Sequence, residues 1–209
     1  LHLCDRRQRQ MCIRDRCHPL HTVDIDDSGL RSSVQKGVLN TKLGVPFRTP
    51  AEGQNIAFTS LWDNYPDSLT VSLKGKASRA YLLMAGSTNH MQCHIDNGLI
   101  RVYYKDGTCD KVALRNPDNW APIEHIFFED GLAFNRHVPA LYRLRLKTGE
   151  ISNNFGEELG FPGASRELDG GAAILLEMPL NPDKKLSHLV LETLSNDVVI
   201  GLMGITLQR

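Results

Sequence analysis

Two segments place aromatic rings beside amide and carboxylate side chains, a combination suited to sugar recognition. They are Trp62-Asp63-Asn64-Tyr65 and Asn116-Pro117-Asp118-Asn119-Trp120. An aromatic face packs against the C–H groups of a sugar, while planar polar groups hydrogen-bond its hydroxyls. The candidate glycan contacts are therefore Trp62, Asn64, Tyr65, Asn119 and Trp120. The alternative for both tryptophans is packing at the edge of the fold, as is common for large aromatic residues.

One acidic segment follows the start of a calcium-binding loop. Asp24, Asp26 and Ser28 supply oxygen ligands at the first, third and fifth positions, and Gly29 stands at the sixth. The twelfth position is Gln35, where a bidentate Glu is required. We therefore expect a polar turn here.

A second group contains zinc-type ligands. His90, Cys93 and His94 have spacings that would share one face of a helix. The turn signal Asp96-Asn97-Gly98 follows them, which favours a loop, and no fourth ligand is apparent nearby. We assign no metal site and no cofactor from the sequence.

Motifs that would nominate an active site are absent. The sequence contains no G-x-S-x-G, P-loop, H-E-x-x-H or strand-following G-x-G-x-x-G motif. A carboxylate pair for glycoside hydrolysis cannot be chosen by spacing alone from the 22 acidic residues that follow residue 16. We nominate no catalytic residue and expect a chain that is not catalytic on its own.

Short strands separated by turns are expected to position the candidate loops. Polar and apolar residues alternate along Ser68–Leu73, and Arg79–Ala85 is a nearly continuous apolar run typical of a buried strand. Asp106-Gly107, between Leu99–Tyr104 and Thr108–Leu114, predicts a β-hairpin. The other expected strands are Ile56–Trp62, Glu124–Phe128, Ala140–Lys147, Ala172–Met178, Leu186–Leu194 and Val198–Leu207.

This pattern predicts an all-β fold, a β-sandwich or jelly roll of about ten strands. Residues 17–45 show no hydrophobic period of their own, so we expect an irregular lead-in followed by a sandwich domain over residues 46–209. Ser152–Gly171 is rich in Gly, Glu and Asn, which indicates a long surface loop. Ser195-Asn196-Asp197 is expected to be a hairpin turn between the last two strands.

Charge and hydropathy exclude two classes of partner. The 209 residues include 24 Lys+Arg and 24 Asp+Glu, so the formal net charge is zero. A nucleic-acid groove normally needs a basic excess, and we therefore expect no nucleic-acid partner. No apolar run approaches the roughly 18–20 residues of a bilayer span, so we expect no membrane span.

The first sixteen residues differ from the rest, because they hold five Arg and two Asp. A basic arm or a transit peptide would have this composition. The string Met11-Cys12-Ile13-Arg14-Asp15-Arg16 also looks like a translated sequencing adapter, so we treat residues 1–16 as non-native and expect them to pack against nothing. The remaining cysteines, Cys17, Cys93 and Cys109, lack the spacing of a disulfide framework or zinc ribbon.

Several short motifs beyond residue 16 are similar, as a set, to one group of proteins. They are Cys17-His18-Pro19, Ile25-Asp26-Asp27-Ser28-Gly29-Leu30-Arg31, Gly44-Val45-Pro46-Phe47, Ser60-Leu61-Trp62-Asp63-Asn64-Tyr65-Pro66-Asp67-Ser68, Tyr81-Leu82-Leu83-Met84-Ala85-Gly86-Ser87-Thr88-Asn89, Tyr104-Lys105-Asp106-Gly107-Thr108, Arg115-Asn116-Pro117-Asp118-Asn119-Trp120 and Val198-Val199-Ile200-Gly201-Leu202-Met203. In this set the chain resembles the C-terminal region of large, poorly characterised bacterial glycoside-hydrolase-like proteins. The Gly-Val-Pro-Phe element, a later Gly-Lys-Ala and the Asp-Gly hairpin also resemble galactose-binding-like sandwiches attached to rhamnosidase-type enzymes.

The resemblance implies a non-catalytic, carbohydrate-associated accessory domain of a larger exported glycoside hydrolase, periplasmic or secreted, used in polysaccharide degradation. It implies two partners, a glycan and a catalytic domain upstream in the same chain. Two alternatives remain open: a structural module that docks on and stabilises that domain, or a fragment that contributes to a shared active-site cleft. An exposed aromatic-lined groove would favour the carbohydrate-associated domain. A broad apolar patch would favour the docking module, and a cleft with perturbed carboxylates would favour the fragment of a shared active site.

Overall fold

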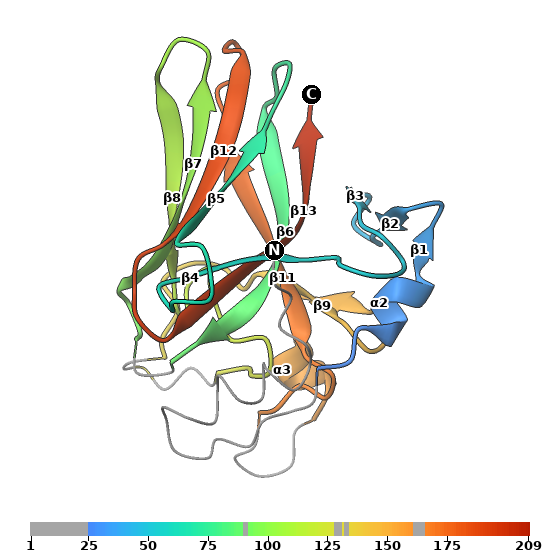
Figure 1. The fold of residues 1–209 in the computed structure, drawn as a ribbon. Coiled ribbons are helices and arrows are strands. Elements are labelled where there is room, and N and C mark those ends of the chain that lie inside the picture. The colour runs from blue at the N-terminus through green and yellow to red at the C-terminus, as the bar shows by residue number, and fades with distance from the viewer. Residues whose placement is uncertain (1–24, 90–91, 128–130, 132–133, 161–165) are drawn as a thin grey trace.

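Two antiparallel sheets face each other, and a third, smaller sheet lies on the flank (Figure 1). The computed structural model describes residues 25–89, 92–127, 131, 134–160 and 166–209. The larger sheet has the strand order β10 (Ile151–Ser152), β9 (Tyr142–Arg145), β11 (Ala172–Pro179), β6 (Arg79–Thr88), β13 (Val198–Gln208), β4 (Ala57–Ser60). The smaller has the order β5 (Ser68–Ser72), β12 (Leu186–Thr193), β7 (Asp96–Tyr104), β8 (Cys109–Arg115). The predicted all-β sandwich is confirmed.

The main core lies between these two sheets. Leu82 and Met84 of β6 pack there with Ile100 and Val102 of β7, and all four side chains are buried. The intervening residues of β6 point to the opposite face of the sheet, where Leu83 is also fully buried. Burial on both faces explains why this strand is a continuous apolar run rather than an alternating one.

Residues 28–48, most of which fall within the expected lead-in of residues 17–45, form a third layer. It contains α2 (Ser28–Ser32), β1 (Val34–Gln35), β2 (Val38–Asn40) and β3 (Pro46–Arg48). Three of its side chains, Leu30, Leu39 and Phe47, are buried in the cluster on the outer face of the six-stranded sheet. These elements are too short to show a period of their own, so contact with the sheet, not local pattern, determines them.

The hairpin prediction is confirmed. Strands β7 and β8 pair antiparallel on either side of the turn, and Gly107 has φ +86°. Val102 and Tyr104 are buried while Tyr103 between them is half-exposed, as alternation along a strand requires.

Three local predictions differ from the structure. The expected strand at Glu124–Phe128 is wrong: residues 124–127 form a turn and one bridge, His125 to Glu167, and Phe128 lies outside the described residues. The expected surface loop contains α3 (Phe155–Glu158), whose Phe155 is buried. The segment after β12 is not a hairpin turn, because β12 and β13 belong to different sheets.

Residues 1–16 lie outside the described residues, so their expected lack of packing stays a prediction. In the part of the chain that the structure describes, no helix has the length and apolar character needed to cross a bilayer.

Candidate functional site

The loop after β4 brings three of the sequence-predicted contacts together. The ring centroids of Trp62 and Tyr65 are 6.4 Å apart, and Tyr65 meets Phe58 edge-on at 6.3 Å. Both Trp62 and Tyr65 are half-buried, whereas Asn64 is exposed. This loop therefore offers partial aromatic faces and one accessible amide.

Asn119 holds the loop that follows β8 in place. Its Oδ1 accepts a hydrogen bond from the Arg115 N–H at 2.7 Å, and its Nδ2 donates to the Ala113 carbonyl at 2.8 Å. Both polar atoms of the amide are thus committed to the turn. The structure gives Asn119 a positioning role for this loop.

Trp120 is part of the core. Its side chain has no exposed surface (0%) and packs in the cluster between the two sheets. Trp120 is therefore packed in this structure, as the alternative expected, and its role as a sugar contact stays a prediction. Burial of its large apolar area between the sheets outweighs any advantage of display on a loop.

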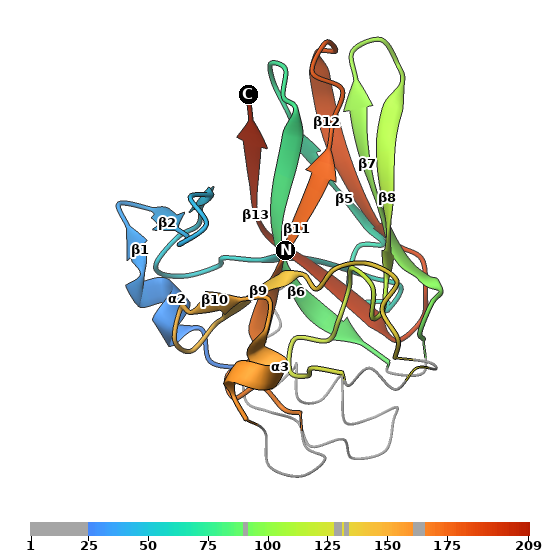
Figure 2. The same cartoon turned by 180° about the vertical axis from the view of Figure 1, so that it is seen from behind.

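A cavity of about 330 Å³ lies at the end of the sandwich that carries α3, and we call it the loop-end cavity. Seen from behind, α3 lies at the opposite end of the molecule from the β7–β8 turn (Figure 2). The cavity wall combines ring and hydrogen-bonding side chains, among them His125, Phe127, Phe134, Arg136, Asn153 and Asn154. The Phe127 and Phe134 rings stack at 4.6 Å with an interplanar angle of 6°.

Arg143 holds one wall of this cavity from inside the protein. Its guanidinium donates hydrogen bonds to the carbonyls of Pro122 (2.8 Å), Ile123 (3.2 Å), His125 (2.5 Å) and Ala172 (3.1 Å). Burial lowers the pKa of Arg143 to about 10, which still leaves it charged at neutral pH. Arg143 therefore binds three carbonyls of segment 122–125, while the Ile123 and Glu124 carbonyls also accept backbone N–H bonds from Ala172 and Leu168.

Glu124 lies on the same segment with its carboxyl in a desolvated position. Burial raises the pKa of this carboxyl against the opposing effects of a backbone hydrogen bond and of Arg143, and the charge of Glu167 adds a smaller increase. Within the described parts of the chain, its Oε2 has no hydrogen-bond partner. The structure thus contains one perturbed carboxyl beside the cavity-lining His125.

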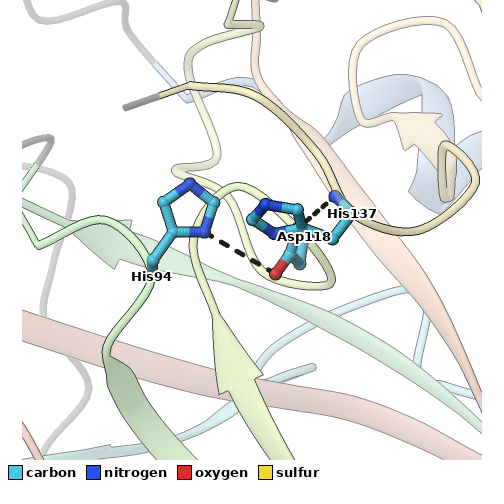
Figure 3. Close-up of side chains that lie close together, drawn as sticks. All are labelled: His94, Asp118 and His137. Carbon is cyan, nitrogen blue, oxygen red and sulfur yellow. Dashed lines mark hydrogen bonds and ion pairs between the residues drawn. The ribbon is translucent and has the colours of Figure 1, made fainter. Parts of the chain in front are cut away.

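A second feature joins three side chains from separate loops (Figure 3). The Asp118 carboxylate lies between two imidazoles, with Oδ2 at 3.8 Å from His94 Nδ1 and Oδ1 at 3.4 Å from His137 Nδ1. The two rings are 4.7 Å apart, centroid to centroid. We call these residues the His94–Asp118–His137 cluster, and all three ligand-type atoms lie within 4.8 Å of one another.

Backbone contacts position the cluster. The His94 N–H donates to the Asn116 carbonyl at 2.7 Å, and the His137 N–H donates to Asp118 Oδ1 at 2.7 Å. His94 has φ +55°, a conformation that is uncommon for residues other than Gly. The loops before β7, after β8 and around residue 137 thus converge on one carboxylate.

Asp118 connects the two features, since it also lines the loop-end cavity. Comparisons with protein-family models, curated proteins and solved structures found no match. The function is therefore inferred from the geometry of this end of the sandwich.

Sequence spacing grouped His94 with His90 and Cys93, and not with Asp118 or His137. His90 lies outside the described residues, and Cys93 Sγ accepts a hydrogen bond from Asn116 Nδ2. Asp118 and His137, which lie beside His94 in the structure, come from distant loops brought together by the sheet. Nothing in their local sequence marks them as a group.

The acidic segment that resembles a calcium loop has a structural role. Asp26 Oδ1 accepts a hydrogen bond from the Ser28 N–H at 3.0 Å, and Asp27 pairs with Arg31 at 2.8 Å. Asn55 also donates to Asp27 at 3.1 Å. These contacts hold the start of α2, and Asp24 lies outside the described residues.

Proposed function

We propose that this chain is a non-catalytic, carbohydrate-associated accessory domain, with a galactose-binding-like sandwich, of a larger exported glycoside-hydrolase-like protein. The observation that carries the proposal is the loop-end cavity, in which aromatic rings and hydrogen-bonding side chains meet at one end of a rigid sandwich. Loops on a rigid scaffold are the usual place for such binding groups.

The composition of the cavity wall suits a sugar. Sugar rings present C–H faces that pack on aromatic side chains, and hydroxyls that need donors and acceptors around them. Phe127 and Phe134 supply stacked rings, while Asn153 is exposed at the same cavity. The volume of about 330 Å³ is at the lower end of the range for small-molecule sites, which favours a sugar unit over a long chain segment.

The loop after β4 is a second candidate surface. Trp62 and Tyr65 form an aromatic pair beside the exposed Asn64. The loop-end cavity surrounds its rings with more hydrogen-bonding side chains, so we rank the loop after β4 below it. The two surfaces belong to different loops and are separable by mutation.

Isothermal titration calorimetry of the full chain against plant and bacterial oligosaccharides and polysaccharides tests the proposal. We expect Phe134→Ala to weaken binding about tenfold, which corresponds to about 1.4 kcal/mol for one lost aromatic contact. Tyr103→Ala is the matched control, because Tyr103 stacks on His188 next to the β7–β8 turn.

The outcomes distinguish the two surfaces. Binding that is lost in Trp62→Ala and kept in Phe134→Ala would move the contact to the loop after β4. Absence of binding to every glycan tested would overturn the proposal and favour a domain that docks on a catalytic partner.

A further inference from the structure

We propose that His94, Asp118 and His137 bind one divalent transition-metal ion, with Zn²⁺ the best fit. Two imidazole nitrogens and one carboxylate oxygen are the donor set that Zn²⁺ takes in many protein sites. Ca²⁺ and Mg²⁺ prefer all-oxygen shells, and softer ions prefer sulfur, so this set selects against both groups. The site does not depend on glycan binding.

The distances are close to those of a metal shell. Tetrahedral zinc with bonds of about 2.1 Å places its ligand atoms about 3.4 Å apart. Asp118 Oδ1 and His137 Nδ1 are already 3.4 Å apart, and Asp118 Oδ2 and His94 Nδ1 are 3.8 Å apart. Closing the cluster around an ion therefore needs only small side-chain movements.

The Asp118 carboxylate is already fixed in position and partly shielded from water. Its side chain is 14% exposed, and the His137 N–H fixes Oδ1 from the backbone. The His94 backbone is fixed in turn by the Asn116 carbonyl. A preorganised carboxylate with little access to water binds a cation more strongly than an exposed one, because water screens the charge less.

Three protein ligands leave at least one coordination position for water or another ligand. Asp118 also lines the loop-end cavity, which places an ion bound here at the rim of that cavity. An ion there would link the loop before β7 to the loop after β8 and to His137. It would stabilise the folded state by an amount that grows with the logarithm of its concentration divided by its Kd.

The test is metal titration of the full chain after removal of metal with a chelator. Calorimetry with Zn²⁺ gives stoichiometry and affinity, and absorption with Co²⁺ reports the ligand type. We expect one equivalent bound, with Co²⁺ bands of a nitrogen and oxygen site and no thiolate charge-transfer band. This readout separates the cluster from Cys4, Cys12 and Cys17, which would give such a band.

The decisive variant is His137→Ala, because His137 is 64% exposed and its loss should leave the fold intact. Loss of a supporting residue around a metal typically costs 10–100-fold in affinity, so loss of a ligand should cost about 100-fold or more. Asp118→Asn should lower zinc affinity in the same way. His188→Ala on β12 removes a histidine outside the cluster and is the matched control. Zinc binding of unchanged stoichiometry and affinity in His137→Ala and Asp118→Asn would overturn the proposal.

Discussion

The ring of Trp120 packs directly against the backbone of Gly86, with no space for a side chain between them. A Cβ on Gly86 would lie 3.0 Å from Cη2 of Trp120 and 2.0 Å from the carbonyl oxygen of Val199. The Gly86 carbonyl also accepts a hydrogen bond from the Ile123 N–H at 2.8 Å. This contact joins the loop after β8 to the middle of the six-stranded sheet.

Gly86→Ala should therefore destabilise the protein. The added methyl must displace the β13 backbone at Val199 and also crowds the Trp120 ring, and overpacking of this kind costs about 1–3 kcal/mol. Gly156→Ala is the control, because a Cβ there would meet only Ile126 at 3.9 Å. Urea unfolding of both variants measures the difference, and equal stability would contradict the packing described here.

Gly107→Val should destabilise the β7–β8 hairpin by about 1 kcal/mol or more, because Gly107 has φ +86° and a β-branched residue is strained there. A Cβ at this position has open space around it, so backbone conformation alone sets the effect. Asn tolerates the left-handed region, so Gly107→Asn should lose less stability than Gly107→Val. Thermal unfolding of the two variants checks this order, and equal melting temperatures would count against the turn geometry.

Much of the fold follows from local signals in the sequence. The alternation along β5, the apolar run of β6 and the Asp106-Gly107 turn each depend on neighbouring residues, and each is found as predicted. The third layer was not predictable in this way. Leu30, Leu39 and Phe47 are buried only because the outer face of the six-stranded sheet is apolar, which is a property of residues far away in the sequence.

The candidate site was less predictable for the same reason. Residue types in the sequence identified the loop around Trp62 as one that carries aromatic and polar side chains. They could not show that the Trp120 side chain faces the core. The His94–Asp118–His137 cluster depends on a bridge between Cys93 and Asn116, which no spacing rule reports. Long-range pairing, and not motif content, assembles this end of the sandwich.

Glu124→Gln should change how stability depends on pH. Burial raises the pKa of Glu124 above its ordinary value of 4.5, so the folded state keeps this proton to higher pH than the unfolded state does. The contribution of the neutral carboxyl is complete below pH 4.5 and is lost as pH rises through the folded-state pKa. Gln cannot ionise, so the variant should keep its stability over that range.

The measurement is the free energy of unfolding of both proteins from pH 4 to pH 8. Glu52→Gln, at an exposed position, is the control and should follow the wild type. A Glu124→Gln curve parallel to that of the wild type would show that the desolvated carboxyl does not contribute to the pH dependence.

Arg143→Met should loosen the wall of the loop-end cavity and destabilise the fold. The variant keeps an apolar stem of similar length but leaves the carbonyls of Pro122, His125 and Ala172 without their buried donor. Each unsatisfied buried carbonyl costs about 1–3 kcal/mol, and partial access of water to the loosened segment reduces the total to about 3 kcal/mol. Amide hydrogen exchange should rise at residues 123–126 more than in the central strands.

The neighbouring Arg145→Met is the matched control for Arg143→Met. Arg145 pairs with Glu150, which is exposed, at 3.2 Å, and an exposed ion pair contributes about 0–1 kcal/mol. The two substitutions remove the same charge from the same strand, so the difference between them isolates the carbonyl contacts. If both variants lost equal stability, or if amide exchange at residues 123–126 were unchanged in Arg143→Met, the guanidinium would not be what holds this wall. Because the same wall carries His125, the Arg143→Met variant should also lose any glycan affinity that depends on the loop-end cavity, while Arg145→Met should retain it.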